Sequence, residues 1–249
     1  MSDRVARTER PRVTLVTGGA RRLGAEIVRS FAARGDDIVL HHGSSAADAD
    51  ALAAELRGAG IRVLVVQENL EDTLAPARIV DAAMTEFGRL DVVVSSASVM
   101  TNRPFDEVTP ADWDTAHAVN LRAPFFLMQA AGRAMREGGT IVQMSDHLAF
   151  ESIFPHLIPH QVTKYALSQL VRTVAGALAP RVRVNAVAPG LVLAPKELSA
   201  AAIERFLEDV PLGRSGAPSD VIGAIHYLVD APYVNGIVLP VDGGRHFRR

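Results

Sequence analysis

The sequence predicts one α/β domain, a doubly wound parallel sheet of about seven strands with helices on both faces. Short apolar runs rich in Val, Leu and Ile alternate with longer helical patterns along the chain. These runs are apolar at nearly every position, which is typical of parallel strands buried on both faces. No linker, repeat or low-complexity segment divides the 249 residues, a length that suffices for one domain with a filled core.

Seven runs are predicted as strands, each followed by a turn or a helical pattern. In chain order they are 13–17, 37–40, 61–66, 91–95, 140–145, 181–188 and 236–241. The helical patterns include 24–35, 49–60 and 123–138, each ending near a glycine that can adopt the left-handed C-cap. Strands that alternate with helices pair in parallel through right-handed crossovers, so the helices divide between the two faces of the sheet.

The composition excludes several classes of protein. A formal net charge of -2 argues against a nucleic-acid surface, and the absence of cysteine excludes disulfides and Cys-ligated metal. No apolar run approaches the ~18 residues of a membrane span, and the charged N-terminus lacks the apolar core of a secretion signal. We therefore expect a cytoplasmic protein with no nucleic-acid or membrane partner. Residues 1–11 are expected to be a flexible leader and 12–249 one domain.

A glycine-rich turn, TGGARRLG at 17–24, lies between the first strand and the first helix. Free N–H groups and the helix dipole at such a junction bind phosphate. Gly18 would permit the tight turn and Gly24 the close approach of the helix. This context favours a Rossmann-like dinucleotide site over the alternative, an ordinary turn between a strand and a helix.

The end of the second strand predicts which dinucleotide binds. An acidic residue there would bind the ribose hydroxyls of NAD and repel the extra phosphate of NADP. The segment LHHGSS at 40–45 contains no acid, and it provides His42, Ser44 and Ser45, while Arg21 and Arg22 lie in the glycine-rich turn. Hydroxyls, a histidine and guanidinium groups suit a 2′-phosphate, so NADP(H) is the predicted cofactor.

From about residue 12 to its end, the chain resembles the short-chain dehydrogenase/reductase family. The matching features are TGGARRLG, NL at 69–70, SSAS at 95–98, Asn120 in AVNLRAPF, Lys164 and RVNAVAPG at 183–190. Within the family, Arg22 in the turn, the loop after the second strand, Asp146 and the C-terminal VDGGRHFRR resemble pteridine reductases and the dihydromonapterin reductase branch.

The resemblance implies a role for each matching residue. Lys164 would hold the nicotinamide ribose, Asn69 would contact adenine, and Arg22 would contact both a cofactor phosphate and a pterin. The implied cofactor-binding residues are Gly18, Arg21, Arg22, Leu23, Gly24, His42, Ser44, Ser45, Asn69, Leu70, Ser96, Ala97, Ser98, Met144, Lys164, Pro189 and Gly190. The implied substrate-binding residues are Arg22, Ser98, Met100, Asp146, His160 and Leu191, and the implied catalytic residues are Asn120, Asp146, His160 and Lys164.

Three departures from the family pattern bear on activity. His160 stands four residues before Lys164, where the family has its catalytic tyrosine. Asp146 and Lys164 are one residue farther apart than the pattern requires, with the extra residue expected within 154–159. Met100 stands where pteridine reductases have an aromatic residue that stacks on the pterin, and a thioether packs against a flat ring less specifically.

Histidine is a doubtful substitute for the tyrosine. Positions 160 and 164 share one face of a helix, and a lysine cation disfavours imidazolium while it favours an ionised phenol. A carboxylate at Asp146 would oppose that effect if it lay close enough. We therefore expect His160 to orient substrate or water. The family resemblance implies that Asp146, through water, assists protonation of a substrate nitrogen.

The predicted function is NADPH-dependent reduction of a flat C=N substrate, most of all a dihydropterin. The alternatives are a non-catalytic NADP(H)-binding or regulatory protein, in which His160 is only structural and Asp146 only caps a strand end, and a reductase of another natural-product imine or ketone. The loop 191–214 is expected to cover a small-molecule substrate.

The remaining histidines, His41, His42, His117, His147 and His156, are interpreted as surface or turn residues without a metal site. Family members pair through the helices equivalent to 123–136 and 160–179, so the resemblance implies a homodimer or homotetramer.

Overall fold

The computed structural model describes residues 10–150, 154–194 and 199–247. Within them, seven strands form one sheet in the order β3-β2-β1-β4-β5-β6-β7, and every neighbouring pair is parallel. The strands are β1 (Val13–Thr17), β2 (Asp37–His42), β3 (Val63–Gln67), β4 (Val92–Ser95), β5 (Gly139–Met144), β6 (Val182–Pro189) and β7 (Val238–Val241). The predicted fold class is confirmed.

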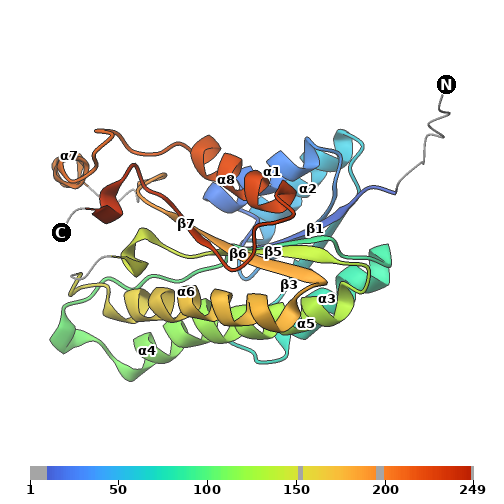
Figure 1. The fold of residues 1–249 in the computed structure, drawn as a ribbon, viewed down its shortest axis with the longest axis horizontal. Helices are drawn as coiled ribbons and strands as arrows, with labels where there is room; N and C mark the ends of the chain where they lie inside the picture. The colour runs from blue at the N-terminus through green and yellow to red at the C-terminus, as the bar shows by residue number, and fades with distance from the viewer. Residues whose placement is uncertain (1–9, 151–153, 195–198, 248–249) are drawn as a thin grey trace.

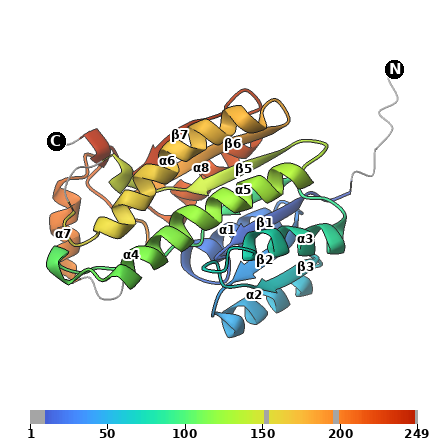
Figure 2. The same cartoon turned by 90° about the horizontal axis from the view of Figure 1, so that it is seen from below.

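Helices cover both faces of the sheet (Figure 1). One face carries α1 (Arg22–Ala32), α2 (Ala46–Gly58) and α8 (Pro218–Asp230), and the other carries α3 (Ala75–Phe87), α5 (Ala123–Ala134) and α6 (Ile158–Leu178). Helix α4 (Pro110–His117) continues through a π-helical turn, η2 (Ala118–Arg122), into α5. Figure 2 shows α5 and α6 side by side across the second face.

The alternation of side chains along each strand builds two cores. In β1, Leu15 packs into the core shared with α3, α5 and α6, whereas Val16 packs into the core shared with α1, α2 and α8. Both side chains are fully buried, and such burial stabilises the fold by roughly 1.5–3 kcal/mol per large aliphatic side chain. Continuous apolar runs are therefore required in the central strands.

Two loop predictions need correction or refinement. The segment 191–214, predicted as a loop, contains α7 (Ala200–Glu208), whose N-terminus is capped by Ser199 accepting from the amide of Ala202 at 3.2 Å. Its apolar side chains are at most half buried, and none of them belongs to the buried residues of the two cores. Residues 154–157 form a turn, and α6 begins at Ile158. His160 and Lys164 therefore lie one helical turn apart within α6. Residues 151–153 lie outside the described residues.

The strand order places the functional region. The chain crosses from β3 at one edge back to β4 beside β1, so the crossovers diverge on either side of β1 and β4. In doubly wound sheets, ligands bind outside the carboxyl ends of the strands at this switch point. Helices α4 and α7 and the last described turn, η4 (Arg245–Phe247), lie at one end of the molecule (Figures 1 and 2).

Candidate active site

The carboxyl ends of β1 and β4 are joined by one hydroxyl. Thr17 Oγ1, fully buried, accepts from the amides of Ser96 at 3.1 Å and Ala97 at 3.2 Å. A Cβ on Gly18 would lie 2.8 Å from the Cα of Ala97, so only glycine allows this approach of the two loops. The predicted residues of the two segments are therefore neighbours at the switch point.

The glycine-rich turn is held closely against the first turn of α1. Gly18 has a φ of +64°, and a Cβ on Gly24 would lie 2.1 Å from the carbonyl oxygen of Gly18. No side chain caps the N-terminus of α1, whose N-cap is the exposed Arg21, and Leu23 is half buried beside the second core. An uncapped helix N-terminus behind a turn that admits no side chain fits a pyrophosphate.

Arg22 adopts a φ of +52°, in the left-handed region that disfavours side chains. Its guanidinium donates to the carbonyl oxygen of Leu193, after β6. The phosphate turn is thereby connected to the segment that precedes α7. Arg22 thus lies between the predicted cofactor and substrate regions, as its two implied roles require.

The interpretation of the β2 histidines as surface residues is wrong. His41 and His42 are 1% and 4% exposed, because β2 continues to residue 42 and both side chains enter the protein. His41 Nδ1 accepts from the Gly18 amide at 3.2 Å, and burial lowers the pKa of His41 to about 4. His42 Nδ1 is buried without a hydrogen-bond partner, which leaves it available to a ligand at this strand end.

An acidic residue, Asp48, lies near this strand end, although residues 40–45 themselves contain none. Asp48, in the first turn of α2, lies 3.8 Å from Arg21 Nε, and both side chains are largely exposed. Ser44 is exposed, and Ser45 is the N-cap residue of α2 without a side-chain capping bond. Arg21 is therefore partly neutralised at the place where a 2′-phosphate would bind.

The segment after β3 contributes less directly. Leu70 is buried in the core, and Asn69 Oδ1 accepts from the Glu71 amide at 3.0 Å, which shapes the turn. Asn69 itself is exposed at the same edge of the sheet.

Asp146, at the end of β5, accepts three N–H groups. Its Oδ1 accepts from the Leu148 amide at 3.0 Å and lies 2.9 Å from His147 Nδ1, while its Oδ2 lies 3.1 Å from His160 Nε2. Its side chain is 24% exposed, whereas that of His160 is 4% exposed. Asp146 is an N-cap, as the structural alternative proposed, and it also joins two histidines.

The hydrogen bonds decide the charge of Asp146. Burial alone would raise the pKa of its carboxyl group, but hydrogen bonds from His147 and His160 outweigh burial and hold the pKa well below its usual range. Asp146 is therefore a carboxylate across the physiological range of pH. It can accept a hydrogen bond or bind a cation but does not itself store a proton.

His160 contacts Oδ2 of Asp146 and is more deeply buried than the carboxylate. Its Nδ1 is 3.0 Å from the carbonyl oxygen of Val99, so both ring nitrogens face acceptor oxygens. In this arrangement, neither ring nitrogen is available to form a hydrogen bond with a substrate. The geometry agrees with an orienting role for His160.

Lys164 lies one helical turn beyond His160 and is 3% exposed. Its Nζ donates to the carbonyl oxygen of Met144 at 2.7 Å. Burial lowers its pKa to about 8, although Asp146 acts in the opposite direction. A buried amine with a pKa near neutrality is a frequent feature of functional sites.

Asn120 lies in the π-helical turn η2, a distortion that is frequent at functional sites. Its Oδ1 accepts from the Val99 amide at 2.9 Å and from Ser98 Oγ at 3.1 Å. Its Nδ2 donates to the carbonyl oxygen of Val99 and lies 3.5 Å from His160 Nδ1. Asn120 therefore fixes the loop after β4 against α6.

The other predicted substrate residues surround this cluster less closely. Met100 is 53% exposed, Leu191 is half buried, and Gly190 packs so closely on Asp242 that a Cβ would lie 2.9 Å from its Cα. The structure thus gathers the predicted residues along one edge of the sheet, with Met100 at the periphery.

His147 is the site residue that the sequence interpretation missed. It is 8% exposed, and its Nδ1 also lies 3.2 Å from the carbonyl oxygen of Pro189, the last residue of β6. Its position next to Asp146 was the available signal. In the described residues, no group of three His, Asp or Glu side chains is arranged to hold a metal ion.

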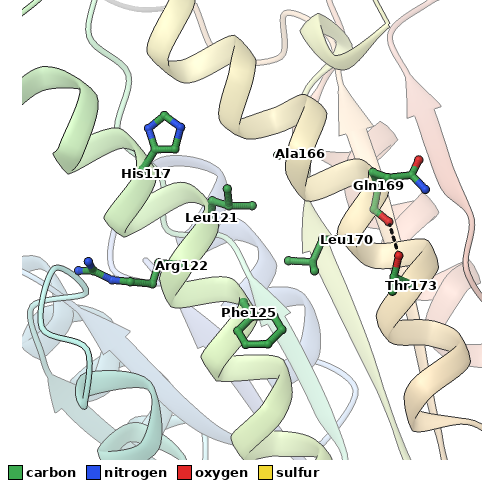
Figure 3. Close-up of a pocket in the computed structure, with 8 residues that line it drawn as sticks. All are labelled: His117, Leu121, Arg122, Phe125, Ala166, Gln169, Leu170 and Thr173. Carbon is green, nitrogen blue, oxygen red and sulfur yellow. Dashed lines mark hydrogen bonds between the residues drawn. The ribbon is translucent and has the colours of Figure 1, made fainter. Parts of the chain in front are cut away.

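A separate apolar groove lies between α6 and the continuous helix formed by η2 and α5 (Figure 3). Leu121 and Phe125 line one side, and Ala166 and Leu170 line the other. This groove belongs to the helices that the family resemblance assigns to subunit pairing.

Fold and site together define a doubly wound protein with a glycine-rich turn at its switch point. A family model described as enoyl-(acyl carrier protein) reductase matches residues 18–246. An uncharacterised oxidoreductase of Methylorubrum extorquens is 33% identical over 241 residues, which cover 94% of this chain and 97% of that protein. The versicolorin reductase of Emericella nidulans is 31% identical over 250 residues, covering 94% and 95%. The chain belongs to the short-chain dehydrogenase/reductase family, a family of oxidoreductases.

Solved structures resemble this fold closely. A blue fluorescent protein from a metagenomic library, solved with NADPH, superposes with a TM-score of 0.88 at 32% identity, covering 94% of this chain and 97% of that one. Alternative dihydrofolate reductase 1 of Brucella suis, solved with NADP, gives a TM-score of 0.86 at 30% identity, covering 96% of each chain. Among the described helices, none has the length and apolar character needed to cross a membrane.

Proposed function

We propose that this protein is an NADPH-dependent reductase of a flat C=N substrate, most of all a dihydropterin. The observation that carries the proposal is Asp146, an ionised and partly exposed carboxylate at a site without the family's tyrosine. A ketone needs an acid that protonates its oxygen, whereas a basic imine nitrogen can be protonated and then stabilised by a fixed carboxylate.

NADP(H) is the cofactor that the residues fit best. Gly18 and Gly24 leave room for the pyrophosphate, and Arg22 can leave Leu193 to bind a phosphate. Arg21, Ser44, Ser45 and the unpartnered His42 Nδ1 would surround a 2′-phosphate. Pro189 and Gly190 would border the nicotinamide. The titles of the two solved neighbours, which name NADPH and NADP, support this choice.

When bound, the cofactor would supply a hydride to the carbon of the C=N bond. The protein then has to hold the substrate and provide one proton to the nitrogen. Asp146 would bind the protonated nitrogen directly or through a water that carries the proton from solvent. His160 and Asn120 would keep Asp146 and the loop after β4 in place, and Lys164 would hold the nicotinamide ribose.

The alternative dihydrofolate reductase among the neighbours supports a pterin-type substrate. The versicolorin reductase among the relatives supports the second possibility, a natural-product carbonyl. The absence of the tyrosine disfavours that possibility on chemical grounds. A protein that only binds the cofactor would not require an ionised, partly exposed carboxylate at position 146.

The deciding experiment is NADPH oxidation by the purified protein with dihydropterins, cyclic imines and ketones, with product identified by mass. We expect turnover with a C=N substrate and little with ketones. Turnover confined to ketones would contradict the C=N proposal. Cofactor binding without turnover of any compound would favour the non-catalytic alternative.

A further inference from the structure

His147 makes contacts that the proposed reaction has not yet used. Its Nδ1 faces two acceptors, Asp146 Oδ1 at 2.9 Å and the carbonyl oxygen of Pro189 at 3.2 Å. A carbonyl oxygen can only accept, so Nδ1 carries the hydrogen and donates to both. His147 therefore ties the carboxylate at the end of β5 to the end of β6.

The ring of His147 also packs against two aromatic side chains. Phe206 of α7 meets it nearly at right angles, with centroids 5.6 Å apart, and Phe154 lies at 6.4 Å. Such edge-on contacts fix the plane of a ring. The direction of the Nδ1–H bond is therefore set by packing that includes α7.

Helix α7 is in turn held by the C-terminal turn η4. The Arg245 guanidinium lies 3.9 Å from the centroid of Phe206, and its Nη1 donates to the carbonyl oxygen of Phe206 at 3.0 Å. Arg245 is 7% exposed, so this contact is shielded from solvent. A continuous chain of contacts runs from Arg245 through Phe206 and His147 to Asp146.

We propose that His147 is a positioning residue: it aims the Asp146 carboxylate at the substrate, and Phe206 keeps it in that orientation. This role rests on the proposed function, because the orientation of the Asp146 carboxylate matters only if the carboxylate contacts the substrate nitrogen. His160 holds Oδ2 and His147 holds Oδ1, so the carboxylate is fixed at both oxygens. A pair of fixed donors limits rotation of the carboxylate more than either donor alone.

Two substitutions separate the hydrogen bond from the packing. His147→Asn places an amide N–H close to the position of the ring Nδ1–H but removes the aromatic edge. His147→Phe keeps a ring against Phe206 but has no N–H group. We expect the Asn variant to retain turnover within ~3-fold and the Phe variant to lose ~10- to 100-fold in kcat with KM for NADPH unchanged.

A readout independent of turnover is the titration of the Asp146 carboxyl group by carbon NMR, assigned with Asp146→Asn. The groups that face this carboxylate are His147 from the short helix η3 (His147–Ala149) and His160 and Lys164 from α6, while Arg245 lies beyond Phe206. Losing one N–H donor raises the carboxyl pKa, so it should rise in the Phe variant and stay low in the Asn variant.

The outcomes distinguish the two proposals. If the parent reduces no C=N substrate but the titration behaves as expected, the function is wrong and the His147 contact stands. If the Phe variant titrates and turns over like the parent, His147 does not position Asp146. Equal loss in both variants, with melting curves unchanged, would assign the effect to ring packing and overturn the hydrogen-bond role.

Discussion

Asp146 combines two tasks that are usually separate, capping a short helix and presenting a partly exposed charge. Its neighbours Leu148, His147 and His160 all donate N–H groups to it. At the scale of single residues, the chemistry therefore depends on one carboxylate and its orientation.

This arrangement predicts unequal effects of two substitutions. Asp146→Asn should leave NADPH affinity nearly intact and lower turnover by roughly 10²-fold or more, because it removes the negative charge at the substrate nitrogen. His160→Ala should lower turnover less, because the buried ring only holds one oxygen of Asp146. Steady-state rates and a calorimetric NADPH titration of each variant measure the two effects.

Equal loss of turnover in the two variants would show that the proton passes through His160. An Asn variant as active as the parent would reduce Asp146 to its capping role.

Helix α6 delivers both His160 and Lys164 to the site, and it buries an amine in doing so. The low pKa of Lys164 follows from that burial, which the negative charge of Asp146 only partly offsets. Element packing, rather than any sequence neighbour, thus determines the charge of this residue. The consequence should be visible in the stability of the protein.

Between pH about 8 and 10.5, the unfolded chain holds a proton on Lys164 that the folded chain has released. The free energy of unfolding contributed by this group therefore rises with pH across that window and is constant below it. Compared with Lys164→Met, the parent should gain on the order of 1–3 kcal/mol from pH 8 to 10.5. Urea unfolding of both proteins without cofactor over this range measures the difference, and a relative loss would contradict the assignment.

At the scale of the whole molecule, a cofactor at the proposed site would join the two halves of the sheet across β1 and β4. A ligand that binds only the folded state stabilises it by an amount set by its affinity. Arg21, Arg22 and the acid-free segment 40–45 predict that NADPH binds at least ~10-fold more tightly than NADH, about 1.4 kcal/mol. Calorimetry with both cofactors tests this, and equal affinities would refute it.

Asp48 supplies a control for that measurement. Asp48→Asn frees Arg21 from an exposed ion pair, and such pairs contribute only ~0–1 kcal/mol. The variant should bind NADPH slightly more tightly and NADH unchanged. A gain for both cofactors would place Arg21 on the shared pyrophosphate instead.

The groove between α5 and α6 predicts how subunits meet. Phe125 is 37% exposed in this groove, beside Leu121 and Leu170 (Figure 3). Phe125→Glu should shift a dimer or tetramer towards monomer, because a charge would be buried in an apolar interface. Light scattering after size exclusion measures the mass. Phe105→Glu, at an exposed phenylalanine outside the groove, should leave it unchanged.

The sequence by itself determined the fold class and the edge of the sheet at which the candidate site lies. Continuous apolar strands and the glycine-rich turn follow from the residues of each segment alone. They can therefore be predicted without knowledge of the contacts between segments. Gly18 and Gly24 illustrate this, because a turn that tolerates no Cβ requires glycine at those positions in any such fold.

Tertiary structure alone decided which side chains meet. The extent of β2 buried His41 and His42, the fold of α7 carried Phe206 to His147, and the first turn of α2 brought Asp48 to Arg21. Charge followed from the same contacts, since Asp146 is ionised through donors at 147, 148 and 160. The contacts of Phe206 with His147 and of Asp48 with Arg21 join segments far apart in the chain, and their distances depend on the packing of whole elements, which no local pattern records.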